Sequence, residues 1–158
     1  MHTHNLSSEK GLKMKISWGV IGIATGAAIV LNSLWMPAKA WMAHELIADS
    51  WQQLLETGKP VKPWPWADMH AIAKLSITRL AEERIVLRSS DPSSLAFSVG
   101  AIEPYNQIQS NAPVVIAGHN DTHFAFLKEV LMDDVISLTD EFGVNHLYQV
   151  DQILVIDE

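Results

Sequence analysis

The 158-residue chain contains no cysteine, which excludes disulfide bonds and thiolate metal sites within these residues. Positive charge is also scarce: 11 Lys and Arg stand against 18 Asp and Glu, for a formal net charge of −7. A nucleic-acid partner requires a basic surface that meets phosphates, so we expect no nucleic-acid binding. Repeats and low-complexity tracts are absent, and the length fits one domain of ordinary size with an appendage.

Charge is missing altogether between Lys15 and Lys39. The uncharged residues 16–38 read ISWGVIGIATGAAIVLNSLWMPA, enough to cross a hydrocarbon core of about 30 Å as a helix. Trp18 and Trp35 lie near its two ends, where aromatic rings favour the membrane interface. No polar face recurs at helical spacing, which argues against a helix buried in a protein core. The segment therefore predicts a transmembrane anchor over residues 16–38, with membrane lipid as its partner.

The lysines around this segment predict its orientation. Three precede it and one follows it closely: Lys10, Lys13 and Lys15 before, and Lys39 after. Positive charge is retained inside, so we expect residues 1–15 in the cytoplasm and the rest of the chain exported. Ala38-Lys39-Ala40 also fits a signal-peptide cleavage site, which leaves a cleaved signal as the alternative. The apolar stretch exceeds the usual core of roughly 7–15 residues, which favours the anchor.

Residues 39–58 predict an amphipathic helix. Its apolar side chains fall on one side of a helical projection: Ala43, Ile47, Trp51, Leu54 and Leu55. Gly58 and then Pro60 supply the expected stop, and His44 is expected to be an ordinary solvated residue.

Residues 59–72 predict an extended linker strap. Pro60, Pro63 and Pro65 fall within six residues and forbid helix. Trp64 and Trp66 carry large apolar rings that we expect to be buried against a neighbour. The strap would then clamp the helix to a β domain.

Residues 73–158 are rich in strand patterns. Strands are expected at 73–77, 84–88, 114–117, 135–138 and 146–156, with helical turns at 124–131 and a hairpin at 140–143. Residues 95–99 fit a short helix or a strand equally well. Short strands separated by turn signals predict a mainly β fold, a small barrel or sandwich. Residues 152–156 form an apolar strand that needs neighbours, which predicts a fold cut short at residue 158.

The candidate functional residue is His119. Residues 114–127 read VVIAGHNDTHFAFL, a strand that stops at Gly118 and delivers a histidine at its exit. An imidazole there suits proton transfer near neutral pH. His123 follows four residues later, so a metal-dependent hydrolase using His119 and His123 is an alternative. A third ligand is not close in sequence, and the H-E-x-x-H pattern is missing.

Three features resemble the sortases of Gram-negative bacteria (class GN), in order and at matching spacing. They are the apolar N-terminus, the strap at 62–68 reading KPWPWAD, and the segment 116–124 reading IAGHNDTHF followed by Phe126-Leu127. The resemblance covers roughly residues 60–158. It implies an eight-stranded β-barrel anchored in the inner (cytoplasmic) membrane as a single-pass protein, with the C-terminal domain in the periplasm.

The resemblance also implies a reaction. In sortases a cysteine thiolate cleaves an LPxTG-like sorting motif after its threonine, and an amine or water resolves the acyl-enzyme. The partner would be the sorting-signal peptide of a secreted surface protein, and neither a cofactor nor a metal is implied. By the match, His119 takes the position of the catalytic histidine that protonates the leaving amine, whereas His123 has no catalytic counterpart.

The sequence departs from the sortase pattern at its end. In sortases the cysteine ends the seventh strand and an arginine lies on the eighth, and both follow the region that matches residues 150–156. We therefore expect residues 73–158 to form a partial sortase β-barrel that lacks the last two strands and is inactive as a transpeptidase. Arg79, Arg84 and Arg88 lie too early to match the missing arginine. A non-catalytic, peptide-binding sortase-like domain is the main alternative.

Overall fold

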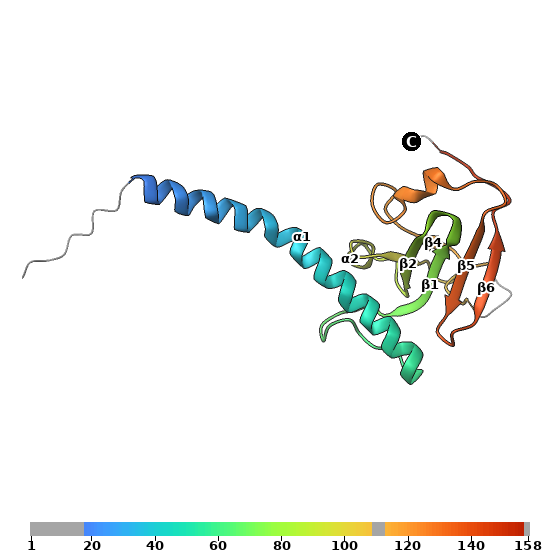
Figure 1. Cartoon of the computed structure of the whole chain (residues 1–158). Helices are drawn as coiled ribbons and strands as arrows, with labels where there is room; N and C mark the ends of the chain where they lie inside the picture. Colours follow the sequence, from blue (N-terminus) through green and yellow to red (C-terminus); the bar gives the residue numbers. More distant parts are fainter. Residues whose placement is uncertain (1–17, 109–112, 157–158) are drawn as a thin grey trace, which may run out of the picture. The chain divides into compact units, whose positions relative to one another are not determined.

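The computed structural model describes residues 18–108 and 113–156, and the chain divides into two compact units, Met1–Ala38 and Lys39–Glu158. Its first described element is helix α1 (Trp18–Thr57), which contains Pro37 (Figure 1). The predicted segments 16–38 and 39–58 both fall in this one helix, apart from residues 16–17, which lie outside the described residues, and Gly58.

The part of α1 in the first unit is apolar on all sides. Large side chains are exposed all along it: Val20, Ile21, Ile23, Ile29, Val30, Leu31 and Leu34. Among the described residues, α1 is the one helix long and apolar enough to cross a membrane, with a mean hydropathy of 1.6 over its most apolar stretch. A helix that is apolar all round needs an apolar environment on every side.

The part of α1 in the second unit packs on the β-sheet as an amphipathic helix. Ile47 contacts Ala67, Met69 and Leu87, and its neighbours Trp51 and Leu54 contact Ala71. Ala43 is buried as well, whereas Leu55 remains 38% exposed, so the predicted apolar face is confirmed without Leu55.

The helix ends as its sequence predicts. Gly58 adopts a left-handed backbone with φ 66°, and its N–H donates to the Leu54 carbonyl at 2.8 Å. His44 is exposed on this helix, as expected.

The sheet is a half-barrel of six strands in the order β4-β3-β2-β1-β5-β6 (Figure 1). The strands are β1 (Ala71–Ile77), β2 (Glu82–Leu87), β3 (Val99–Ala101), β4 (Ile116–Ala117), β5 (Val135–Asp140) and β6 (Asn145–Gln149). All neighbouring strands are antiparallel except the parallel pair β2 and β3. The fold is therefore mainly β, as predicted.

The sheet buries a core on each face because strand side chains alternate. On β2, Leu87 contacts the α1 cluster, whereas Val86 joins the opposite core with Leu75, Val99 and Phe126. Short helices connect the strands: η1 (Thr78–Leu80), α2 (Pro92–Leu95) and η2 (Ala125–Glu129). The undecided residues 95–99 thus divide between the end of α2 and the start of β3.

Two expectations are wrong in part. The predicted strand 146–156 ends at Gln149, and residues 150–156 form no strand. The backbone of Val150 pairs instead with Asp133 and Asp134, and the apolar side chains beyond it are exposed. An apolar run becomes a strand only where a neighbouring strand offers free backbone groups.

The strap supplies the second correction. It forms no helix, as its prolines predict, but β1 already begins at Ala71. Trp64 is half-buried edge-to-face against Phe97, with ring centroids 5.3 Å apart. Trp66 is 80% exposed, contrary to the expected burial.

Candidate functional site

His119 lies just beyond the exit of β4 and is exposed to solvent. β4 pairs with β3 through Gly100–Ala117 and Ala101–Ile116, so the sheet fixes the point at which the chain leaves it. The carbonyl of His119 accepts hydrogen bonds from the N–H groups of Phe124, at 2.9 Å, and Thr122, at 3.4 Å. These bonds close residues 119–124 into a tight loop that leads into η2.

Gly118 is required for this exit because the backbone passes very close to two side chains. A Cβ at this position would lie 2.8 Å from the Phe124 ring and 2.8 Å from Val99 Cγ1. Both contacts are far shorter than ordinary van der Waals distances. Glycine therefore lets β4 end directly beside the core, with His119 as the next residue.

Arg84 of β2 fixes the His119 loop, residues 119–124, by a hydrogen bond to its backbone. Its Nε donates to the His123 carbonyl at 2.9 Å, and its guanidinium lies 5.2 Å from the centre of the Phe126 ring. Glu82 fixes the guanidinium through an ion pair of 2.7 Å. Arg84 is thus a positioning residue for the His119 loop. The sequence did not reveal this role, because its partners lie about forty residues away along the chain.

His123 lies on the inner side of the same loop and is half-buried. Burial lowers the pKa of His123 below its ordinary value of 6.5, and the charges of Arg84, His44 and His119 act in the same direction. A hydrogen bond with the backbone of Ala96 opposes the shift. The lowered pKa favours the neutral form of the His123 imidazole.

Beside the loop lies an apolar hollow of about 560 Å³, the η2 cavity. Its lining comes from η2, the sheet and the C-terminal segment, and includes Asn120, Phe124, Leu127, Val130, Ile136 and Leu154. Asn120, which lines the cavity, is the residue after His119, although His119 itself is not among the lining residues. It has room for an apolar side chain of a peptide.

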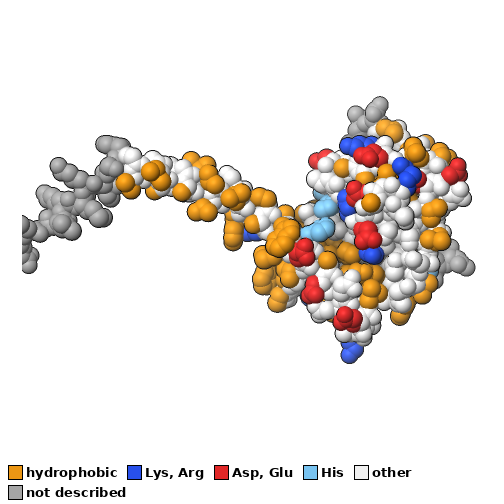
Figure 2. Space-filling view, viewed as in Figure 1, with side chains coloured by type: hydrophobic (Ala, Val, Ile, Leu, Met, Phe, Trp, Pro, Cys, Tyr) orange, Lys and Arg blue, Asp and Glu red, His pale blue; other side chains and the backbone are white. Residues whose placement is uncertain are grey.

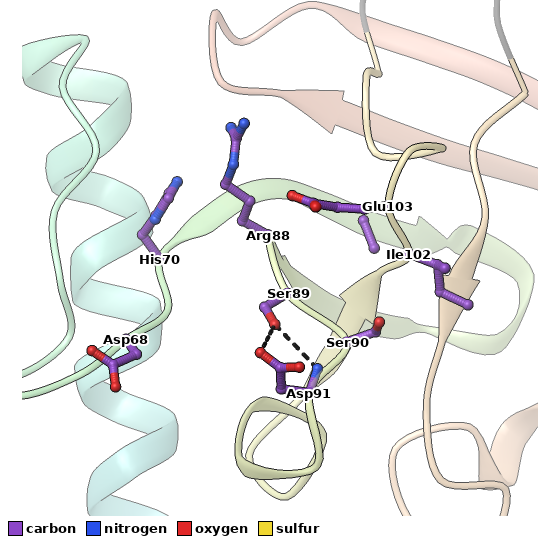
Figure 3. A pocket seen from close by; sticks show the side chains of 9 residues that line it. Asp68, His70, Arg88, Ser89, Ser90, Asp91, Ile102 and Glu103 are labelled. Carbon is purple, nitrogen blue, oxygen red and sulfur yellow. Dashed lines mark hydrogen bonds between the residues drawn. The ribbon is translucent and has the colours of Figure 1, made fainter.

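A second, polar pocket of about 420 Å³ lies just beyond Leu87, the last residue of β2 (Figure 3). Its side chains carry both signs of charge: Asp68, His70, Arg88, Asp91 and Glu103. The Ser89 hydroxyl donates to Asp91 Oδ2 at 2.7 Å, so it faces a carboxylate rather than an imidazole base (Figure 3). Burial lowers the pKa of His70, and Arg88 and Lys62 lower it further while Glu141 opposes them.

The structure does not support the alternative of a metal-dependent hydrolase that uses His119 and His123. Within residues 18–108 and 113–156, no three His, Asp or Glu side chains converge on a point that would hold an ion. His119 and His123 share one loop, but His119 is exposed while His123 turns towards Ala96.

Comparisons with known proteins agree with this architecture. Residues 75–158 match the family model of the sortase domain. No curated protein is significantly similar in sequence. The sortase D5 transpeptidase of Clostridium perfringens is 17% identical with a TM-score of 0.53 over 70% of each chain, which shows a shared fold.

Two further solved structures are similar. Sortase A from Corynebacterium diphtheriae is 26% identical with a TM-score of 0.49. It aligns over 55% of this chain but only 43% of its own length, so the chain spans less than half of that relative. Streptococcus agalactiae sortase C1 is 18% identical with a TM-score of 0.48, over 73% of this chain and 66% of its own. Because the family model matches more than half of its residues, the chain belongs to the sortase family.

Proposed function

We propose that this chain is the histidine-bearing part of a membrane-anchored, class GN sortase-type transpeptidase in which His119 is the catalytic acid. The observation that carries the proposal is the exposed His119 at the exit of β4, inside the matched residues 75–158. An imidazole is the side chain used most often to donate or accept a proton in catalysis. His123, which is half-buried and bonded to the backbone of Ala96, has a structural role.

The proposed reaction is acyl transfer. A cysteine thiolate attacks the carbonyl carbon of the threonine in an LPxTG-like sorting motif. The peptide C–N bond then breaks, and the imidazolium of His119 donates its proton to the departing amine. A thioester acyl-enzyme remains until an amine acceptor or water attacks it. The 158 residues hold no cysteine, so the thiolate would come from a segment outside them, and the chain alone would be inactive.

The substrate would lie along the β4 exit. The η2 cavity beside Asn120 supports this, because its apolar lining suits an aliphatic side chain of the sorting signal. Arg84 would keep the His119 loop in place while the peptide binds, through its hydrogen bond to the His123 carbonyl.

The proposed anchor is the first part of α1. Its exposed apolar side chains and the lysines before residue 16 favour a single crossing of the inner membrane. The unit Lys39–Glu158, which we call the β unit, would then lie in the periplasm.

A hybrid enzyme tests the assignment of His119. The chain is extended after Glu158 with the cysteine-bearing and arginine-bearing strands of a solved sortase, and cleavage of a fluorescent LPxTG-like peptide is followed. We expect the hybrid to cleave the peptide and His119→Ala to lower the rate about 10²–10⁴-fold, the usual contribution of general acid–base catalysis. His123→Gln is the matched control and should retain most of the activity. Equal rates with and without His119 would refute the assignment.

The absence of cysteine favours a second candidate, a non-catalytic domain that binds sorting peptides. The intact mass of the native protein, extracted from its own membrane, separates the two. A mass well above 17.5 kDa with a peptide that reacts with a thiol reagent would support the transpeptidase. A mass of 17.5 kDa together with saturable binding of the sorting peptide would support the binding domain.

A further inference from the structure

The β unit exposes large apolar side chains beside the strap. Trp66 is 80% exposed, and Met42 on the facing helix is 53% exposed. Between helix and strap runs a groove of about 690 Å³, which we call the strap groove. Its lining is mostly apolar: Met42, Ala43, Leu46, Trp64, Trp66, Ala67, Met69 and Phe97, with Lys39 and Asp68. Figure 2 shows orange hydrophobic side chains gathered on this side of the β unit.

The strap groove is part of the folded structure rather than a loose loop. Trp64 packs edge-to-face on Phe97, and the Ala67 N–H donates to the Trp64 carbonyl at 3.0 Å. Below the strap, the buried Ala67 and Met69 contact Ile47 of α1. The exposed Trp66 therefore extends from a fixed backbone. An apolar patch kept exposed in this way marks a binding surface.

The course of the chain indicates what covers the groove. Lys39, which lines the groove, directly follows the apolar segment 16–38. Along the chain, Met42 follows the apolar segment by four residues and Leu46 by eight. The headgroup layer extends about 5–8 Å beyond the hydrocarbon on each side. A bilayer crossed by the apolar segment would therefore begin within a few residues of the groove along the chain.

The chemistry of the groove fits that layer. Tryptophan is enriched at membrane interfaces because its ring is apolar while its N–H remains polar. Lysine keeps its ammonium in water while its stem lies on apolar surface. Lys39 and Asp68 together leave the groove close to neutral, so apolar contact rather than net charge would dominate the binding.

We propose that the strap groove is a membrane-docking face, which inserts Trp66 and Met42 into the headgroup layer of the phospholipid bilayer that anchors the chain. This inference rests on the anchoring described under the proposed function. It adds that the β unit lies on the bilayer in one orientation instead of turning freely on its anchor.

Docking would bring the candidate site close to the membrane surface. Two consecutive residues connect groove and site: the backbone of Ala96 hydrogen-bonds His123, and the ring of Phe97 lines the groove. The His119 loop would then face substrates that are still tethered to the same membrane.

A chain of these 158 residues makes the test direct, because it contains no cysteine and an introduced one is therefore unique. Spin labels are attached to Trp66→Cys, to Leu147→Cys on β6, which is 70% exposed, and to Ile29→Cys within α1. The chain is reconstituted in phosphatidylcholine vesicles, and the accessibility of each label to oxygen and to a water-soluble nickel chelate is measured by electron paramagnetic resonance.

We expect the label at 66 to be several-fold less accessible to the nickel chelate than the label at 147, and the label at 29 to lie deepest. If the label at 29 is deep but that at 66 is as accessible as that at 147, docking is refuted and the anchor stands. If the label at 29 is also aqueous, the anchor fails and docking with it. Spin–spin broadening at 66 that depends on protein concentration would show a second copy in the groove, which also overturns the proposal.

Discussion

At the scale of single residues, the candidate site depends on two positions that carry no chemistry of their own. Gly118 lets the backbone pass within contact of Val99 and Phe124, and Arg84 ties the next turn of the loop to β2. His119 itself makes its described bonds through its backbone carbonyl, so its imidazole is placed by the path of the chain. The geometry of the site therefore depends on Gly118 and Arg84, which position the loop that carries His119.

The motif identified His119 from sequence because a strand, a glycine and a histidine are adjacent along the chain. From the sequence, Arg84 could only be compared with the arginine on the eighth strand of sortases, which it does not match. Its contacts with His123 and Phe126 arise from folding over about forty residues, which no local pattern records. The coupling between His44 and His123 likewise joins elements that are far apart in sequence.

Gly118→Ala tests the close approach at the β4 exit. The new methyl would meet the Phe124 ring and the buried Val99 at 2.8 Å, and neither can move without disturbing the core. We expect a loss of about 1–3 kcal/mol in unfolding free energy, as for other overpacked cores. Thermal unfolding of the full chain in detergent micelles measures it. Gly26→Ala is the control, since a Cβ there meets nothing within 4 Å. An unchanged midpoint for Gly118→Ala would contradict the described exit.

At the scale of elements, the strand and helix predictions succeeded where the pattern was local and failed where it depended on a neighbour. β1, β2 and the β5–β6 hairpin follow their alternating residues and turn, and Gly143 in the turn has φ 76°. Residues 150–156 are largely apolar, yet no neighbouring strand in the described part of the chain pairs with them and they remain irregular. The predicted burial of Trp66 was wrong for a similar reason. A local pattern does not show which surface a side chain will meet in the fold, and Trp66 is exposed.

Helix α1 offers a matched pair of variants, one at a buried position and one at a partly exposed position. Trp51 is fully buried with Leu54 and Ala71, whereas Leu55 lies on the exposed edge. We expect Trp51→Ala to lower the unfolding free energy by about 3–5 kcal/mol and Leu55→Ala by about 1 kcal/mol or less. Denaturant titration of the full chain in micelles gives both values. Equal losses would mean that this part of α1 does not cover the sheet.

At the scale of the whole molecule, ionised carboxylates hold both ends of β5, which pairs with β1 and β6. At its start, Asp134 binds Arg79 through two bonds, of 2.5 and 2.6 Å, and accepts the Leu131 N–H. At its end, Asp140 accepts the N–H groups of Phe142 and Val144 and pairs with His146. Burial alone would raise the pKa of Asp140, but these bonds outweigh it and lower the pKa.

Acid should therefore weaken the whole β unit through these two groups. The hydrogen bonds from Arg79 lower the pKa of Asp134 to about 2, from an ordinary value of 3.8. A lowered pKa in the folded state gives stability that is complete above the ordinary pKa and is lost as the pH falls from about 4 towards 2.

Asp134→Asn removes this charge while keeping the shape of the side chain. We expect the variant to melt below the parent at pH 7, with the difference shrinking as the pH falls from 4 to 2, because protonation neutralises the parent's carboxylate there. Thermal unfolding followed by circular dichroism across this range measures the difference. Asp151→Asn, at an exposed position outside the sheet, is the control and should follow the parent at every pH. A difference for Asp134→Asn that stays constant with pH would mean that shape, and not the ion pair with Arg79, stabilises the start of β5.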